Sequence, residues 1–541
     1  MKILGISLGI YDLFVLSLTL LIIRIFGYYY KYYTRQDPLP APFPLPFVGH
    51  LFDHLIYSND FSEYCHRLQD KYGDVYEQWF GSERIIFTIR IEYMDKLLSP
   101  STKSKYLVRL PDPEGLKELG VFGKGLILNH DVSNWKFNRQ FFTQAISAPN
   151  FLKETVNYTQ AAFNEMEECW KIGLDDNTIT DFSEWSHSLA TDIIFQMITG
   201  KKTWATASYF LTVSPGLNSV DMQRFNKEDI KQSSELSKAF QTYIMGLDFF
   251  TLFPKWVRLY IPGFRETHKK ILNARDILFN RIDDIIKERR REIESPPKNE
   301  KLRSDMLTLL ITANTDRSIP DTQGNTQEYT KPLTDEDIRV IIIEALGGGV
   351  DTTANVFSFV IYYLAHHPEV KNQLRQEIDD TINDRSITYE DLSLLTYCEA
   401  VIKEVSRIMA TSPFIGRASS ESDLIGGVER EAGTRYLIFT PGIHLNKDFW
   451  VEPEKFNVDR FINFNEQEQQ NEKKYSLMMW GGGLRQCPGR KMAMIELKCL
   501  LVLTFKNWDI DLVDLNAPLK SEVNLVRSAK DLNVTIKPRN N

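Results

Sequence analysis

Two long apolar stretches stand out in the hydrophobic pattern of the chain. Residues Ile3 to Ile23 are almost continuously apolar and long enough to cross a bilayer as a helix, with Asp12 as the carboxylate within the run. The second stretch begins at Thr334, where Thr334 and Asp337 form an acidic variant of a capping box, and it continues to His366. At about 1.5 Å per residue, this stretch predicts one helix of roughly 45 to 50 Å.

The charges around the first apolar stretch predict its orientation. Only Lys2 precedes the stretch, whereas Arg24, Lys31 and Arg35 follow it. Because basic residues are retained on the cytosolic side of a membrane, this asymmetry predicts that most of the chain is cytosolic. A cleaved signal peptide is the alternative, and the absence of a small-x-small cleavage site after the stretch argues against it.

Three regions follow from this pattern. Residues 1–30 are predicted to form an uncleaved membrane anchor, and residues 31–50 a basic, proline-rich hinge that acts as a stiff spacer. Residues 51–541 contain no internal repeat and no long low-complexity linker, so we expect one large domain. Within it the polar insert Phe464 to Lys474 is typical of a solvated loop.

Composition narrows the class of protein. The chain has 541 residues, of which 43% are hydrophobic, enough for a sizeable core. A formal net charge of -8 argues against a nucleic-acid partner. The five cysteines are widely spaced and include no Cys-x-x-Cys pair, which argues against a disulfide framework or a zinc site and favours a reducing compartment.

The second apolar stretch carries three consecutive glycines, Gly347 to Gly349, followed shortly by Asp351 and Thr352. Each glycine within a helix costs about 1 kcal/mol relative to alanine, so the run needs a reason. We expect a bulky ligand to approach the backbone there and the helix to open locally beside it, with the acid and the hydroxyl placed to relay protons. A phosphate-binding loop fails because no lysine follows the glycines, whereas a glycine-softened hinge in a buried helix remains an alternative.

A glycine run near the C-terminus precedes a lone cysteine, and residues 480–489 read Trp-Gly-Gly-Gly-Leu-Arg-Gln-Cys-Pro-Gly. The glycines allow a tight turn that can approach a flat macrocycle, and Arg485 can neutralise a carboxylate of such a ring. Cys487 stands just before a predicted helix, whose N-terminal partial charge favours a thiolate, and Gly489 can offer its N–H to the sulfur. This arrangement suits a thiolate bound to haem iron; a buried structural cysteine is the alternative.

The loop resembles the haem-binding loop of the cytochrome P450 superfamily, Phe-x-x-Gly-x-Arg-x-Cys-x-Gly, with Trp480 in place of the phenylalanine. The resemblance extends from about Pro38 to the C-terminus and implies that Cys487 is the iron ligand of haem b, iron protoporphyrin IX. Residues 348–353, Gly-Gly-Val-Asp-Thr-Thr, match the oxygen-binding motif of the family. This match implies that Asp351 is the catalytic acid and Thr352 the catalytic hydroxyl.

The same resemblance implies further cofactor-binding residues. Trp135 and Arg139, four residues apart on one predicted helix face, would together engage a haem propionate, and an edge-of-core packing pair is the alternative. Arg417 stands where relatives place a propionate-binding arginine at the start of a small sheet. His444 is a second candidate for a propionate contact, with a satisfied structural histidine as the alternative.

A structural cluster is also implied. Glu404 and Arg407 lie three residues apart on a predicted helix, and Arg460 follows in Phe-Asn-Val-Asp-Arg-Phe, which resembles the family's Phe-x-Pro-x-Arg-Phe. The three would form a buried Glu-Arg-Arg triad that holds the surroundings of the haem loop in register. The spacing alone is uninformative, because Glu288 and Arg291 share it within a charge-rich, solvated helix.

The resemblance implies a mainly α-helical fold with small β-sheets (α+β), the cytochrome P450 fold, preceded by one transmembrane helix. It implies a membrane-anchored, microsomal-type haem-thiolate monooxygenase that inserts one atom of O2 into a lipophilic substrate. Because no flavin or nicotinamide domain is visible, electrons would come from NADPH-cytochrome P450 reductase, with cytochrome b5 as a further donor. The expected location is the endoplasmic reticulum membrane, single-pass, with the catalytic domain 51–541 in the cytosol.

Other functions stay open at this level. A haem-thiolate isomerase or dehydratase would need no reductase, and a non-catalytic membrane haem-binding protein would have no use for the acid and hydroxyl pair. The segments expected to line the pocket, Leu107–Asn129 and Tyr209–Phe264, are apolar and aromatic, and suit a sterol, fatty acid, terpenoid or xenobiotic equally. Lys136, Arg490 and Lys491 are candidates for a reductase-docking face or for ordinary solvated surface.

Overall fold

The computed structural model contains two compact units, residues 1–110 with 414–442 and residues 111–413 with 443–541. The residues that it describes are 2–3, 6–7, 9–57, 60–109, 113–121, 123–175, 178–214, 227–295, 302–317, 331–462, 474–523 and 525–539. Most of the predicted polar insert, 464–473, lies outside them, as do 110–112, 122 and 215–226 of the predicted pocket lining.

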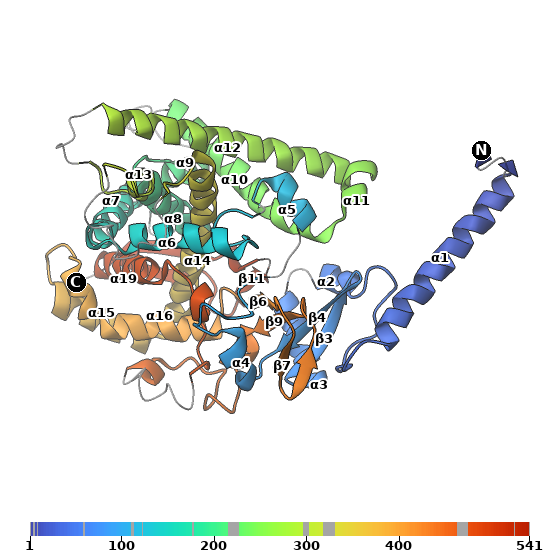
Figure 1. Cartoon of the computed structure of the whole chain (residues 1–541). Coiled ribbons are helices and arrows are strands. Elements are labelled where there is room, and N and C mark those ends of the chain that lie inside the picture. Colours follow the sequence, from blue (N-terminus) through green and yellow to red (C-terminus); the bar gives the residue numbers. More distant parts are fainter. Residues whose placement is uncertain are drawn as a thin grey trace. The chain divides into compact units, whose positions relative to one another are not determined.

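The smaller unit combines a long helix with short strands and helices. Its helices are α1 (Ile10–Tyr33), α2 (Leu51–Ile56), α3 (Phe61–Tyr72) and α4 (Ile91–Leu97), and its strands are β1 (Lys2–Ile3), β2 (Ile6–Ser7), β3 (Val75–Phe80), β4 (Glu83–Thr88), β6 (Phe414–Ala418), β7 (Asp423–Ile425), β8 (Val428–Arg430) and β9 (Arg435–Phe439). The strand order of its largest sheet is β3-β4-β9-β6 (Figure 1), with β4 and β9 parallel and the other neighbours antiparallel.

The larger unit is mainly helical. Its helices are α5 (Pro113–Leu119), α6 (Val132–Ser147), α7 (Pro149–Gly173), α8 (Phe182–Thr199), α9 (Ala205–Val213), α10 (Lys227–Leu252), α11 (Lys255–Tyr260), α12 (Phe264–Glu294), α13 (Met306–Thr312), α14 (Asp335–His366), α15 (Pro368–Ile382), α16 (Thr396–Ile408) and α19 (Arg490–Asn507). Its 3-10 helices are η3 (Glu390–Ser393), η4 (Val458–Phe461) and η5 (Gly483–Arg485), and its strands are β5 (Thr180–Asp181), β10 (Trp508–Leu512), β11 (Lys520–Val523), β12 (Arg527–Lys530) and β13 (Asn533–Pro538). The short helix α17 (Thr440–His444) crosses the boundary between the units.

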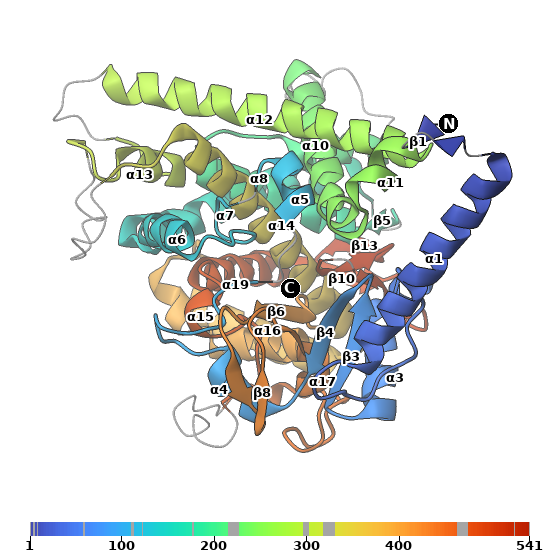
Figure 2. The same ribbon diagram turned by 45° about the vertical axis from the view of Figure 1, so that its right-hand side comes forward.

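Helix α14 forms the centre of the larger unit. It packs against α8, α12, α13, α16 and α19, and Figure 2 shows it passing among these helices. Its start confirms the predicted capping box, because the Thr334 hydroxyl accepts from the N–H of Asp337 and the Asp337 carboxylate accepts from the N–H of Thr334. The predicted mainly helical fold with small sheets is confirmed.

Two of the three glycines of α14, Gly347 and Gly349, pack closely against neighbouring helices. The helix is continuous through Gly347 to Gly349, so the expected opening is wrong for this structure. A Cβ at Gly349 would lie 3.1 Å from Ile194 of α8, and one at Gly347 would lie 3.2 Å from Ile244 of α10. Larger side chains there would push these neighbours away, since protein interiors are close-packed.

The N-terminal helix differs in its bounds from the predicted anchor. Helix α1 runs from Ile10 to Tyr33, so the boundary predicted at residue 30 falls within it. Asp12 lies in the first turn, where its carboxylate accepts from the N–H of Gly9 over 3.0 Å, and it is therefore near the end of the helix instead of at mid-span. Among the residues that the structure describes, two helices, α1 and α14, are long and apolar enough to cross a membrane, and of these two α14 is mostly buried in the protein.

Candidate functional site

The cysteine loop is a tight turn that leads into a helix. Gly481 and Gly483 both have a φ of +67°, a left-handed conformation that other residues rarely adopt. The main-chain N–H of Cys487 donates to the carbonyl of Trp480 over 2.8 Å and closes the turn. The sulfur therefore precedes the first turn of α19, a helix of 18 residues.

Cys487 is the accessible thiol of the chain. It is exposed, whereas Cys65, Cys169, Cys398 and Cys499 are buried. Burial raises the pKa of each of these four thiols, which keeps them protonated and unreactive. The alternative of a buried structural cysteine therefore fits those four and does not fit Cys487.

Two arginines lie near one buried indole. The guanidinium of Arg485 is 3.9 Å from the ring centroid of Trp135, and that of Arg139 is 5.6 Å away. Trp135 is 2% exposed, and its Nε1 has no hydrogen-bond partner within the described residues. A buried N–H of this kind needs an acceptor, so the arrangement suits a negatively charged or carbonyl oxygen supplied by a ligand.

The same arginines bind main-chain carbonyls. Arg485 donates through Nη1 to the carbonyl of Leu126 over 3.0 Å and through Nη2 to that of Asn129 over 2.9 Å. Arg139 donates to the carbonyl of Gln486, the residue before the cysteine. Helix α6 and the segment before it are thereby joined to the cysteine loop.

Asp351 and Thr352 lie on α14 just after the glycines. The hydroxyl of Thr352 donates to the carbonyl of Gly348 over 2.6 Å, which fixes its rotamer against the helix. The carboxylate of Asp351 lies 3.4 Å from Nδ1 of His187 on α8, and both side chains are about one quarter exposed, 28% and 25%. The acid is therefore reachable by water, whereas the hydroxyl has a local acceptor.

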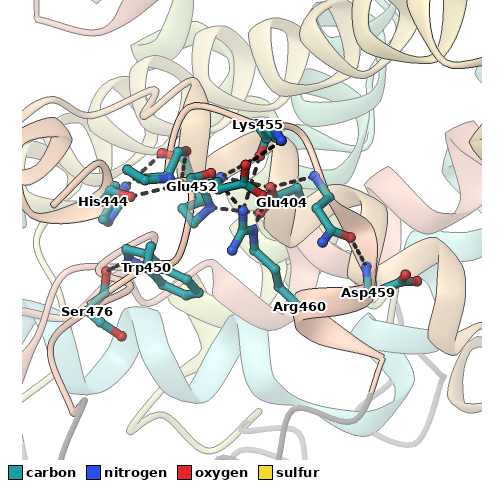
Figure 3. A network of polar contacts seen from close by, with 11 residues as sticks. Glu404, His444, Trp450, Glu452, Lys455, Asp459, Arg460 and Ser476 are labelled. Atoms are coloured by element: carbon teal, nitrogen blue, oxygen red, sulfur yellow. Dashed lines mark hydrogen bonds and ion pairs between the residues drawn. The ribbon is translucent and has the colours of Figure 1, made fainter. Parts of the chain in front are cut away.

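Glu404, Arg407 and Arg460 meet at the end of α16, and Figure 3 shows Glu404 beside Arg460. The carboxylate of Glu404 pairs with Arg407 through two contacts, 2.7 Å to Nε and 2.8 Å to Nη2, and lies 3.4 Å from Nε of Arg460. It also accepts from the main-chain N–H of Asn457 over 2.9 Å. Glu404 and Arg407 are fully buried, so each charge depends on the other for compensation.

His444 belongs to the same network (Figure 3). Its Nδ1 is 3.2 Å from the carbonyl of Arg407, and its Nε2 accepts from the N–H of Met478 over 2.8 Å. Burial lowers its pKa to about 3, which agrees with a neutral ring that accepts at Nε2. Both ring nitrogens have main-chain partners, which favours the structural interpretation of His444 over a propionate contact.

Arg417 lies in the smaller unit, on β6. It is 2% exposed and donates through Nη1 to the carbonyl of Gly416 over 2.8 Å. Burial, together with the nearby charge of Arg109, lowers its pKa to about 9. A buried guanidinium beside a second cation favours an anionic partner, and the propionate role of Arg417 stays a prediction.

A family model for cytochrome P450 matches residues 38–536. The chain belongs to the cytochrome P450 family. A similar protein is cytochrome P450 3A9 of Rattus norvegicus, which is 24% identical over 528 residues that cover 96% of this chain and 94% of the relative. Another is cytochrome P450 4d2 of Drosophila melanogaster, which is 26% identical over 525 residues that cover 93% of this chain and 94% of the relative. Steroid 17-alpha-hydroxylase/17,20 lyase of Ictalurus punctatus is 25% identical over 490 residues, which cover 89% of this chain and 86% of the relative.

The fold of this P450 chain is also similar to a solved structure. The crystal structure of the cytochrome P450DA heme domain matches with a TM-score of 0.72 at 18% identity, and the match covers 93% of this chain and 98% of the other. Proteins of the family are typically monooxygenases, and they bind haem through a thiolate.

The residues of this P450 fit a haem group. An exposed thiol at a helix N-terminus is the donor that a haem-thiolate needs. The buried N–H of Trp135, without an acceptor in the described residues, and the cations Arg139 and Arg485 suit a ring carboxylate. Gly489 adopts φ of -79° at the start of α19, and a Cβ there would lie 3.9 Å from the sulfur of Cys487, in ordinary contact.

Two residues of the site were missed by the sequence analysis. His187 faces Asp351 from α8, and nothing in its local sequence signals this. Glu344 interrupts the apolar run of α14 and is 7% exposed, and its carboxylate accepts main-chain hydrogen bonds from residues 126–128. A carboxylate within an apolar helix requires partners, and that signal could have identified it.

Proposed function

We propose that this chain is a haem-thiolate monooxygenase that inserts one atom of O2 into a lipophilic substrate, with electrons from a separate NADPH-dependent reductase. The observation that carries the proposal is the exposed Cys487 at the start of α19, in one loop with Arg485, which lies against a buried indole. Haem, when bound, supplies the activation of dioxygen, and thiolate donation favours cleavage of the O–O bond.

In this proposal, residues of the chain bind and orient the cofactor. Cys487 is the iron ligand, and the N–H of Gly489 stabilises its sulfur. Trp135, Arg139 and Arg485 bind one ring carboxylate, which neutralises its charge in a buried site. Arg417 would bind a carboxylate from β6.

Asp351 and Thr352 deliver protons in the proposed reaction. Thr352 holds a proton on Oγ1, which it donates to the carbonyl of Gly348 over 2.6 Å and which it could instead donate to another acceptor during the reaction. Asp351 is partly exposed and can exchange protons with water. His187 lies within reach of the Asp351 carboxylate and supports its orientation.

The proposed cellular arrangement follows from α1. We propose that residues 1–30 anchor the chain in the endoplasmic reticulum membrane in a single pass, that 31–50 form the junction, and that 51–541 form the cytosolic catalytic domain.

Arg490 and Lys491 are exposed at the start of α19. Together with Lys136 of α6, they are proposed to contact NADPH-cytochrome P450 reductase, with cytochrome b5 as a second donor. Reversing the charge of Arg490 and Lys491 should slow reduction at low ionic strength without changing substrate affinity.

Oxygen incorporation tests the proposed function. The protein is reconstituted with reductase, NADPH and a microsomal lipid extract under isotopically labelled dioxygen. We expect products that carry one labelled oxygen atom, and Thr352→Ala should release more hydrogen peroxide per NADPH because proton delivery is misdirected. Rearrangement of a lipid hydroperoxide without reductase would instead support an isomerase or dehydratase. Haem binding without any turnover would support the non-catalytic alternative.

A further inference from the structure

Glu344 holds three consecutive amides of the segment before α6. Its carboxylate accepts from the N–H of Leu126, from that of Ile127 over 2.8 Å and from that of Leu128 over 3.1 Å. Three amides that converge on one carboxylate form an anion-binding nest, and charge-assisted bonds of this kind are about twice as strong as neutral ones. Helix α14 therefore fixes this segment through a single, 7% exposed side chain.

Gly125 is the residue that allows this approach. Its φ is +74°, and a Cβ there would lie 2.4 Å from Oε2 of Glu344 and 2.7 Å from Cγ1 of Val340. A side chain at this position would have to displace the carboxylate. Side-chain amides of Asn129 and Asn138 donate to the carbonyl of Gly125 over 3.2 and 3.4 Å, so the turn is fixed from its other side as well.

The carbonyls of the same segment hold Arg485. They are those of Leu126 and Asn129, at 3.0 and 2.9 Å from the guanidinium. Leu126 therefore donates its N–H to Glu344 and accepts at its carbonyl from Arg485, so the anion and the cation polarise one peptide segment in the same sense. The next residue, Ile127, lies 3.8 Å from the position of a Cβ on Gly348.

We propose that Glu344 is a positioning residue for Arg485. It fixes residues 125–129, whose carbonyls set the direction of the Arg485 guanidinium, and thus the charge presented to the haem carboxylate. The inference rests on the proposed function, because the task of Arg485 is defined by the bound ring. Through Glu344, helix α14 would then take part in cofactor binding at a position more than one turn before Asp351 and Thr352.

The test compares two variants with two matched controls. Glu344→Gln removes the anion, and Gly125→Ala places a methyl group against it. Gly123→Ala is the control for the second change, because Gly123 has a similar φ of +66° and a Cβ there would have no atom of the described residues within 4 Å. Glu336→Gln is the control for the first, because Glu336 lies on the same helix but is half-exposed and pairs with Lys124.

Two quantities are measured on the full-length protein. Amide hydrogen exchange of residues 126–128 is expected to accelerate in Glu344→Gln and Gly125→Ala, and to stay near wild type in the controls. Haem transfer to excess apomyoglobin is expected to be about tenfold faster or more in the same two variants, as for the loss of residues that support a ligand. The double variant Glu344→Gln/Arg485→Lys should lose haem no faster than Arg485→Lys alone.

The outcomes distinguish the positioning role of Glu344 from the proposed haem-thiolate function. Faster amide exchange with unchanged haem transfer, or additive effects in the double variant, would mean that Glu344 only stabilises the segment and would overturn this inference. A fall of the haem reduction potential in Glu344→Gln would support it, because a displaced Arg485 no longer offsets the negative ring carboxylate. A wild-type protein that binds no haem at all would overturn the proposed function itself.

Discussion

Glu496 is a fully buried carboxyl group in α19, and neither of its oxygens has a hydrogen-bond partner within the described residues. Burial raises its pKa from 4.5 to about 8, because the charged form would be desolvated without compensation. The group is therefore protonated in the folded protein at neutral pH. An unfolded glutamate is ionised at the same pH, so folding is coupled to the uptake of one proton.

Glu496→Gln should remove this coupling. The folded state of the wild type holds one proton more than the unfolded state between about pH 4.5 and 8, so its stability falls as pH rises through this window. The loss is at most about 1.4 kcal/mol per pH unit. We expect the Tm of Glu496→Gln to rise relative to wild type from pH 5.5 to pH 8, measured by scanning calorimetry. The exposed Glu454→Gln should show no such trend, and parallel curves for wild type and Glu496→Gln would contradict the assignment.

Glu404 and Glu288 share a sequence pattern but not an environment. Glu404→Gln leaves the fully buried Arg407 without a counter-charge, which should cost about 3–5 kcal/mol. Glu288 is 53% exposed and pairs with Lys201 at the surface, so Glu288→Gln should change stability by less than about 1 kcal/mol. Chemical unfolding of the two variants checks the difference. Equal losses would show that the buried network does not stabilise the region around the cysteine loop.

At the scale of elements, the sequence predicted α14 well because its signals are local. The capping box, the apolar run and the histidines before Pro368 all act within one helix. The local opening expected at its glycines was wrong, because the helix is continuous and Gly347 and Gly349 pack against Ile244 of α10 and Ile194 of α8. Which helices approach this closely is decided by the tertiary packing, and a single sequence does not contain that information.

Alanine substitutions separate the glycines of α14. An alanine gains about 1 kcal/mol of helix propensity over glycine. At Gly348 a Cβ would meet, among the described residues, only Ile127, at 3.8 Å, so the gain should be retained. At Gly349 it would meet three atoms of Ile194 at 3.1 to 3.3 Å, which offsets the gain. We therefore expect Gly348→Ala to be more thermally stable than Gly349→Ala by differential scanning fluorimetry. The reverse order would contradict the packing of α14 on α8.

Within the site, too, local features could be predicted from the sequence and contacts between distant positions could not. Arg485, Cys487 and Gly489 are visible because they lie within five consecutive residues. The contacts of Glu344 with residues 126–128 and of Asp351 with His187 join positions more than 150 residues apart, and only the fold brings them together. His444 was a candidate for a propionate contact from its sequence position alone. The structure shows that both of its ring nitrogens lie against main-chain groups, which the sequence does not reveal.

At the scale of the whole molecule, α1 is part of the smaller unit as well as the proposed membrane anchor. Tyr28 and Tyr32 are buried, with ring centroids 6.1 and 5.7 Å from that of Trp79 on β3. Just after the helix, Nε of Arg35 lies 2.6 Å from the fully buried carboxylate of Glu77. In the proposed anchor, residues 10–27 would remain for the bilayer and would span roughly 27 Å, close to its hydrocarbon thickness.

Two truncations test this docking. Deleting residues 2–26 keeps both tyrosines and Arg35, and should leave the Tm of the remaining protein nearly unchanged. Deleting residues 2–36 exposes Trp79 and takes one of two cations from Glu77, the other being Arg84. Leaving a buried charge without any partner costs about 3–5 kcal/mol, and because Glu77 keeps Arg84 we expect a smaller loss, which should still lower the Tm of the second protein in the same detergent. Equal melting temperatures would mean that the end of α1 adds nothing to the unit.

The central claim, a thiolate-bound haem at Cys487, is tested most directly by one spectrum. The dithionite-reduced protein is exposed to carbon monoxide, and the difference spectrum is recorded for wild type and Cys487→Ala. The account predicts a strongly red-shifted Soret band in wild type that disappears in Cys487→Ala, because only a thiolate ligand produces it. A histidine-type band, or the same red-shifted band in both proteins, would contradict it.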